Sequence, residues 1–172
     1  MLKKVSEFFR EMLNATMCFL RCKGETLFLY RNRGEGDIHN GLYVPPGGQT
    51  ERGERGIDCI NREFHEETGL YLLNPKLKMI VTFYNKGRIL GGKENPEDWC
   101  VEVYTAKDFT GTLKEEHPKA KPIWVPDSDL GKIKMHPGDR KILELLDHEG
   151  VLEAIVQYDK EDLTRFETRK VA

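Results

Sequence analysis

Three glutamates stand close together in a segment whose apolar residues recur at helical spacing. Glu63 and Glu67 are four residues apart, so on a helix they stand one turn above each other, and Glu66 lies beside both. Neighbouring carboxylates repel one another, at a cost of about a few tenths of a kcal/mol per pair even in water. A bound divalent cation would remove this cost, and such oxygen ligands suit Mg²⁺ or Mn²⁺. The segment therefore predicts either a metal site or a solvated acidic helix face.

The residues that flank these glutamates favour the metal site. A loop rich in glycine precedes the helix, and an arginine comes directly before the first glutamate. The specified positions run Gly48, five residues, Glu54, seven residues, Arg62-Glu63-Phe64, one residue, Glu66-Glu67, one residue, Gly69-Leu70. This spacing resembles the Nudix box at every defined position, and on it the chain resembles the Nudix hydrolase family.

The resemblance implies a fold and a reaction. Nudix proteins are α+β proteins of the α/β/α sandwich type, in which a mixed β-sheet lies between helices and the box forms a loop, a helix and a second loop. The family uses water to attack a phosphorus atom of a nucleoside diphosphate that is linked to another group. The chain is therefore expected to be an enzyme that hydrolyses phosphoric anhydrides and binds a nucleotide substrate.

The resemblance also implies roles for the residues of the box. Glu63, Glu66 and Glu67 look like ligands of Mg²⁺ or Mn²⁺, and the carbonyl oxygen of Gly48 looks like a further one. Arg62 would pair with these carboxylates and hold them in place. Glu54 would either support the helix or help to move a proton. The glutamate that acts as general base is left open.

Outside the box, most of the chain from residue 14 onward is loosely similar to the MutT-like subgroup of 8-oxo-dGTP diphosphatases, which remove oxidised purine nucleotides in DNA repair. The stretches that carry this likeness are Ala15-Thr16-Met17-Cys18, Leu29-Tyr30-Arg31-Asn32, Asp37-Ile38-His39-Asn40-Gly41, Trp124-Val125-Pro126, Pro137-Gly138-Asp139 and Tyr158-Asp159. The expected products are a nucleoside monophosphate and pyrophosphate. Two other possibilities stay open. The substrate could be ADP-ribose, a nucleotide sugar or a dinucleoside polyphosphate, or the chain could be a nucleotide-binding module without turnover.

Four residues are candidates for contacts with the nucleotide. Asp139 matches an aspartate that reads the edge of the purine in relatives, although it could equally cap the helix that follows. His136 stands where some relatives place a tryptophan that stacks on the base. Arg31 offers a forked contact to phosphate, or is a solvated charge. Tyr43 could line the base site, or belong to the core.

The elements that must position these residues can be placed from periodicity and from turn residues. Residues 57–68 are expected to form a helix that ends at Gly69 in a left-handed cap. A second helix is expected from about Pro137 to His148, and residues 1–13 are expected to form an N-terminal amphipathic helix. Residues 14–172 would then be a single domain. Strands are expected at 15–22, 26–30, 77–84, 99–105, 122–125 and 151–158, with loops at 31–42, 43–56 and 85–98 and a charged tail after 158.

Composition excludes some partners. Basic residues number 27 and acidic residues 29, for a net charge of −2, so no basic field would hold a nucleic acid polymer. No apolar run is long enough to cross a bilayer, and no signal peptide is visible, so no membrane partner is expected. Four cysteines without metal-binding spacing are expected to be free thiols in a reducing cytoplasm. A dimer is possible, and nothing in the sequence decides the oligomeric state.

Overall fold

The computed structural model describes residues 12–32, 34, 39–87, 89–90, 93–94, 97–115 and 120–171. Two helices and a 3-10 turn accompany the strands: α1 (Gly56–Thr68), α2 (Pro137–Glu144) and η2 (Asp127–Asp129). The first strands are β1 (Met12–Cys22), β2 (Glu25–Tyr30), β3 (Tyr43–Val44), β4 (Gly47–Gln49) and β5 (Leu70–Leu73). The middle strands are β6 (Lys76–Lys86), β7 (Ile89–Leu90), β8 (Lys93–Glu94), β9 (Asp98–Ala106) and β10 (Asp108–Gly111). The last are β11 (Lys121–Pro126), β12 (Leu152–Asp159) and β13 (Asp162–Lys170).

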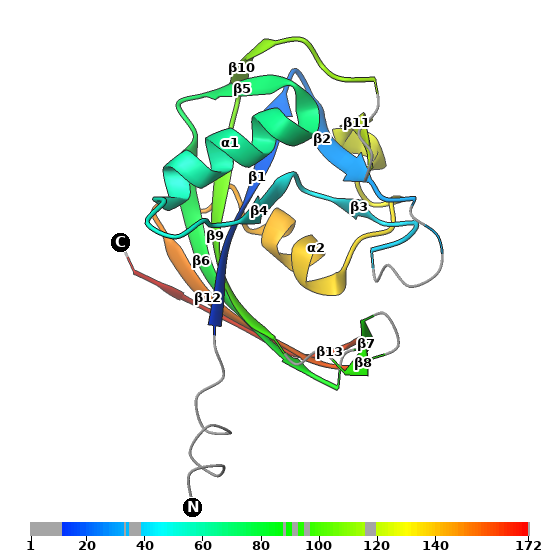
Figure 1. The fold of residues 1–172 in the computed structure, drawn as a ribbon, viewed down its shortest axis with the longest axis vertical. Helices are drawn as coiled ribbons and strands as arrows, with labels where there is room; N and C mark the ends of the chain where they lie inside the picture. The colour runs from blue at the N-terminus through cyan, green and yellow to red at the C-terminus, as the bar shows by residue number, and fades with distance from the viewer. Residues whose placement is uncertain are drawn as a thin grey trace, which may run out of the picture.

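A mixed sheet forms the centre of the molecule (Figure 1). Its strand order is β11-β2-β1-β9-β6-β12-β13, with β3 paired to β2 and β4 paired to β1. Strand β1 is parallel to β9 and β6 is parallel to β12, whereas the remaining pairs are antiparallel. Because β1 pairs with β2, β4 and β9, it connects the two ends of the sheet.

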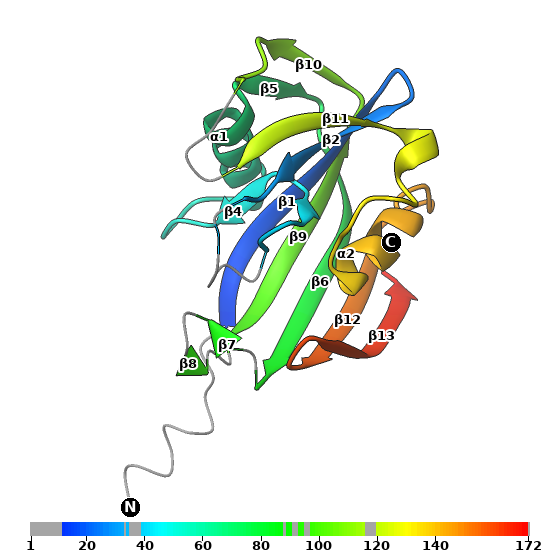
Figure 2. The same cartoon turned by 90° about the vertical axis from the view of Figure 1, so that its right-hand side faces the viewer.

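The two helices cover opposite faces of this sheet (Figure 2). Alternate residues of a strand point to opposite faces, and β1 shows this directly. Cys18 and Leu20 pack in one apolar cluster with Ile60 and Phe64 of α1, whereas Phe19 packs in a second cluster with Ile142 of α2. The expected mixed sheet between helices is therefore confirmed.

Helix α1 forms where its sequence predicts a helix, starting one residue earlier at Gly56. Its buried residues include Ile60 and Phe64, which fall on one stripe. Gly69 ends the helix in the left-handed conformation with φ 79°, and its N–H donates to the carbonyl of His65. The predicted left-handed cap is confirmed.

Several expectations about elements need correction. Met12 and Leu13 belong to β1, so the strand takes the last two residues of the expected N-terminal helix, and residues 1–11 lie outside the described part of the chain. Helix α2 ends at Glu144, four residues before His148. The expected loop at 43–56 contains β3 and β4, and the loop at 85–98 contains β7 and β8. The charged tail forms β13, because an edge strand keeps most of its side chains in water and tolerates charge there.

The antiparallel pair of strands β5 and β10 is also not expected from the sequence. Leu72 and Leu73 pair with Phe109 and Asp108, and β10 follows β9 after a single residue. No helix among the described residues is long and apolar enough to cross a membrane.

We predict that Gly69→Ala will destabilise the fold more than Gly53→Ala. Both glycines have φ near 80°, and the left-handed conformation costs an L-residue about 1–2 kcal/mol. A Cβ at Gly69 would lie 2.5 Å from the carbonyl oxygen of Thr112, whereas a Cβ at Gly53 would meet nothing within 4 Å. In urea unfolding, the free energy of unfolding should fall by roughly 1 kcal/mol or more further for Gly69→Ala than for Gly53→Ala. Equal losses would mean that the close approach to Thr112 has no energetic weight.

Candidate active site

The two glycines of β4 bring the loop backbone against helix α1. Strand β4 pairs with β1, with Gly48 opposite Thr16 and Gly47 opposite Met17. The N–H of Gly47 donates to Oε2 of Glu67 at 2.9 Å. A Cβ on Gly48 would overlap the carboxyl group of Glu63. Only glycine at position 48 therefore lets that carboxylate lie against the loop backbone.

Arg62 joins the loop to the helix through several hydrogen bonds. Its Nε and Nη2 donate to the two carboxylate oxygens of Glu54, each at 2.9 Å. Its Nη1 donates to Oε1 of Glu63 at 2.5 Å and lies 3.6 Å from Oε2 of Glu66. A further contact runs from Nη2 to the carbonyl of Gln49 at 3.3 Å. One guanidinium thus neutralises carboxylates on both segments, and its planar fork suits this task.

The ionisation of Glu54 follows from this pairing. The hydrogen bonds from Arg62, followed by the one from the N–H of Glu51, lower the pKa of Glu54 from 4.5 to about 2. Glu54 and Glu63 together raise the pKa of Arg62. A general base works best when its pKa lies near the working pH. The geometry therefore favours Glu54 as a support for the helix rather than as a group that carries a proton.

The donors around Gly48 suit a hard divalent cation in their chemistry. The carbonyl of Gly48 and the carboxylates of Glu63, Glu66 and Glu67 supply oxygen atoms alone, which Mg²⁺ and Mn²⁺ prefer. Across the described ranges, no three histidine, cysteine or acidic side chains are already grouped closely enough to hold a metal ion. Glu63 is turned toward Arg62, as the 2.5 Å bond shows. Arg62 contacts Oε1 of this carboxylate, so Oε2, which lies against Gly48, could bind an ion while the contact with Arg62 is kept.

A buried pair beneath the loop was not found by sequence reasoning. Oγ1 of Thr16 lies 3.2 Å from Sγ of Cys59, and the Cys59 thiol donates to the carbonyl of Gly48 at 3.6 Å. Desolvation raises the pKa of Cys59, so the group stays a neutral thiol. The only sequence signal for this contact is that Cys59 stands one helical turn before Glu63. Cysteine is among the most often buried residues, so this position alone does not predict a contact with the loop.

The candidate base-contacting residues gather on the α2 side of the sheet. His136 immediately precedes α2, and its Nε2 lies 2.7 Å from Nδ1 of His39, a contact that the sequence did not reveal. Asp139 stands in the first turn of α2 and is 8% exposed. His136 occupies the N-cap position without a side-chain cap hydrogen bond, and Asp139 lies three residues further on, so both the base contact and the capping role of Asp139 stay predictions. A carboxylate in the first turn is still favoured by the helix dipole.

Two aromatic residues lie close to this group. Phe83 of β6 lies 3.5 Å from the position that a Cβ on Gly138 would occupy, which places its ring beside the start of α2. Tyr43 of β3 donates its backbone N–H to the carbonyl of Lys134, in the segment that leads to α2. The Tyr43 ring also packs edge-on against Phe28, so it belongs both to the core and to the edge of this site.

A short segment connects the two halves of the site. Residues 43–49 carry Tyr43 at one end and Gly48 at the other, and the carbonyl of Pro46 accepts from the N–H of Cys18 at 2.9 Å. Arg31 lies at the end of β2, where its N–H donates to the carbonyl of Leu42. The segment 43–49 thus joins the box residues at one end to Tyr43, His136 and Asp139 at the other. The backbone of Arg31 is hydrogen bonded to Leu42, the residue before Tyr43.

We predict that Glu54→Gln will flatten the pH dependence of stability in acid. The pKa of Glu54 is lowered in the folded protein, so its stabilising effect is complete above about pH 4.5 and is lost as the pH falls toward 2. Urea unfolding at a series of pH values between these limits should show fewer protons taken up on unfolding in the variant, by up to roughly one. Glu51→Gln, which changes an exposed carboxylate on the same loop, is the control and should keep the wild-type slope.

A family model described as the NUDIX domain matches residues 11–146. A curated relative from Bacillus subtilis (strain 168), the uncharacterized Nudix hydrolase YvcI, is 33% identical over 147 residues, covering 85% of this chain and 87% of the relative.

Solved structures show the same fold. A MutT protein from Bacillus halodurans superposes with a TM-score of 0.77 at 25% identity, covering 91% of this chain and 97% of the other. The NUDIX domain of Shewanella oneidensis NrtR, solved in complex with ADP ribose, superposes with a TM-score of 0.62 at 16% identity, covering 83% of this chain and 94% of the other. The second likeness extends to the fold alone.

Proposed function

The chain belongs to the Nudix family, and from that premise we propose that it is a Mg²⁺-dependent nucleoside triphosphate pyrophosphohydrolase that favours an oxidised purine nucleotide such as 8-oxo-dGTP. Nudix hydrolases act on nucleoside diphosphate-linked substrates, and they generally use a divalent metal ion. The proposed reaction adds water across the anhydride bond between the α- and β-phosphates and releases a nucleoside monophosphate and pyrophosphate.

The observation that carries the hydrolase part of this proposal is the contact between the β4 loop and helix α1. Gly47 orients Glu67, the missing side chain of Gly48 admits Glu63, and Arg62 holds Glu63 from the opposite side. A metal ion bound here would neutralise phosphate oxygens and lower the pKa of bound water. Residues that are fixed before the substrate arrives need little reorganisation during the reaction, which favours catalysis.

The candidate proton acceptor is one of the three helix glutamates. Arg62 holds Glu54 in the ionised form with a pKa near 2, so Glu54 serves as a positioning residue. Glu66 is the most exposed of the three and makes a longer contact with Arg62 than Glu63 does. A carboxylate with more freedom can reach a water molecule beside the substrate without breaking the Arg62 pairs.

The preference for a purine rests on the residues at the start of α2. Asp139 is buried in the first turn of α2, next to the helix start that carries His136. A purine presents ring N–H and carbonyl groups along one edge, and a carboxyl group can pair with them. The rings of Phe83 and His136 stand near enough to this helix start to contact the face of a base. The likeness to a MutT protein supports this choice.

We predict that Glu67→Gln will reduce kcat by roughly 10²–10⁴-fold in Mg²⁺. The amide keeps the shape of the side chain and still accepts the hydrogen bond from the N–H of Gly47, but it lacks the charge that binds a metal ion. Initial rates of pyrophosphate release measure the effect, and thermal unfolding checks that the fold persists. A Glu67→Gln enzyme with wild-type kcat would exclude Glu67 as a metal ligand.

We predict that Asp139→Asn will change the choice of base more than the rate of hydrolysis. A site built to pair with polar groups of a substrate discriminates strongly, because mismatched buried groups are left unpaired. The ratio of kcat/KM for 8-oxo-dGTP to that for dGTP should fall by about tenfold or more, while dGTP hydrolysis changes a few-fold. Glu144→Gln, at the exposed end of the same helix, is the control. A parallel loss on every nucleotide would make Asp139 a structural residue.

A further inference from the structure

One face of the sheet carries apolar residues that neither helix covers among the described residues. Ile80 and Tyr84 of β6 point to the same side as Ile155 of β12, because alternate residues share a face and β12 pairs in register with β6. We call this the outer face and define it by Ile80, Thr82, Tyr84, Glu153, Ile155 and Gln157. The alternate residues Ala154 and Val156 point the other way, into the cluster that contains α2.

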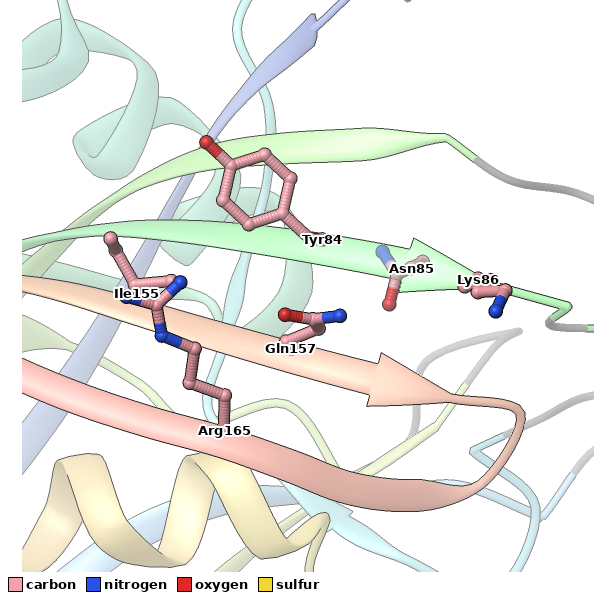
Figure 3. Close-up of a pocket in the computed structure, with 6 residues that line it drawn as sticks. All are labelled: Tyr84, Asn85, Lys86, Ile155, Gln157 and Arg165. Atoms are coloured by element: carbon pink, nitrogen blue, oxygen red, sulfur yellow. The ribbon is translucent and has the colours of Figure 1, made fainter.

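The outer face is hollowed rather than flat. A depression of about 480 Å³ is lined by Tyr84, Asn85, Lys86, Ile155, Gln157 and Arg165 (Figure 3). A second depression of about 430 Å³ lies beside it and shares Tyr84 and Ile155 with the first. Tyr84 is 39% exposed, which is high for an aromatic residue in an inner strand of a sheet. An amphipathic segment could fill these hollows with its apolar side chains.

The edge of this face beside β13 is polar and internally paired. Arg165 forms an ion pair with Glu167 at 2.6 Å, and Arg169 pairs with Glu153. Apolar residues bordered by such charges suit an amphipathic helix. Its apolar side chains would pack on Ile80, Tyr84 and Ile155, and its charged side chains would stay in water.

The described part of the chain begins beside the outer face. Strand β1 starts at Met12, which pairs with Asp98 and lies on the same side of the sheet as the outer face. Met12 is 42% exposed. Only β9 lies between β1 and β6 in the sheet. The distance across the sheet is therefore about two strand spacings, roughly 10 Å, from β1 to β6, and about 14 Å from β1 to β12. Eleven residues in a helix span about 16 Å.

The sequence before Met12 has the matching pattern. Leu2, Val5 and Phe9 follow helical spacing, with Phe8 beside them, and charged residues and one serine occupy the intervening positions. A helix of this length does not persist in water without packing against a partner. The exposed pair Tyr71 and Leu73 on β5 is a competing apolar surface, but Figure 1 shows β5 at the opposite end of the molecule from the start of β1.

We propose that residues 1–11 pack as an amphipathic helix on the outer face, with their apolar stripe over Tyr84 and Ile155. This helix supplies the cover that the face lacks among the described residues. It also ties the start of β1 to β6 and β12, the strands that α2 covers from the other side.

Hydrogen exchange of the full chain, read by mass spectrometry, tests this proposal. In the wild-type protein the amides of residues 2–11 should exchange at least about tenfold more slowly than in a free peptide of residues 1–11. Tyr84→Asp and Ile155→Asp should each return these amides to the peptide rate. Leu73→Asp places the same charge on a side chain that is 42% exposed on β5, and it should leave their protection unchanged.

Protection of the β6 and β12 amides reports whether each variant is folded. If an aspartate variant loses that protection, Tyr84→Thr and Ile155→Thr replace it, because threonine keeps a high preference for strands. Peptide-like exchange in the wild-type protein would overturn the proposal, as would protection that survives the outer-face substitutions in folded protein. Protection that disappears on roughly hundredfold dilution would also overturn it and would make a second copy of the chain the occupant.

Discussion

The arrangement of the candidate site depends on one arginine that holds several carboxylates. Glu63, Glu66 and Glu67 repel one another, and Glu54 adds a fourth negative charge from the loop. Arg62 binds Glu54 through two bonds and Glu63 through a third, so loop and helix are fixed to each other through the same group that lowers the repulsion. Without a cation at this point, repulsion between Glu54 and the helix carboxylates would oppose their close approach, although pairing with β1 would still hold β4 in the sheet.

The rest of the fold brings a second set of residues to this centre. Strand β1 carries the β4 loop and α1 on one side and the cluster of α2 on the other. The segment 43–49 then links the metal-side loop to Tyr43, beside the start of α2. The candidate metal-binding residues and the candidate base-reading residues thus belong to different layers of the sandwich. Substitutions near the start of α2 could therefore alter the choice of base without changing the residues of the β4 loop and α1.

Local patterns were sufficient to predict the elements with strong periodicity or clear end signals. Helix α1, its cap at Gly69 and the strands β2, β6, β9, β11 and β12 were placed within a few residues. Strand β13 was not predicted, because its charged side chains lie in water and only pairing with β12 makes it a strand. The contacts Gly47 to Glu67, Cys59 to Gly48 and His39 to His136 join residues up to 97 positions apart, and no spacing rule reveals them. The box residues themselves were recognisable because their roles depend on fixed spacing along one loop and helix.

The central claim is that this arrangement hydrolyses a nucleotide anhydride and selects an oxidised purine. The most direct test is a release assay in Mg²⁺ that separates pyrophosphate from phosphate across canonical deoxynucleoside triphosphates, 8-oxo-dGTP, ADP-ribose, nucleotide sugars and diadenosine polyphosphates. Our account predicts the highest kcat/KM for 8-oxo-dGTP, with pyrophosphate as product and no turnover after chelation of the metal. A clear preference for ADP-ribose or a nucleotide sugar would contradict the assignment of the base site. Absence of turnover on the whole panel would contradict the catalytic assignment as well.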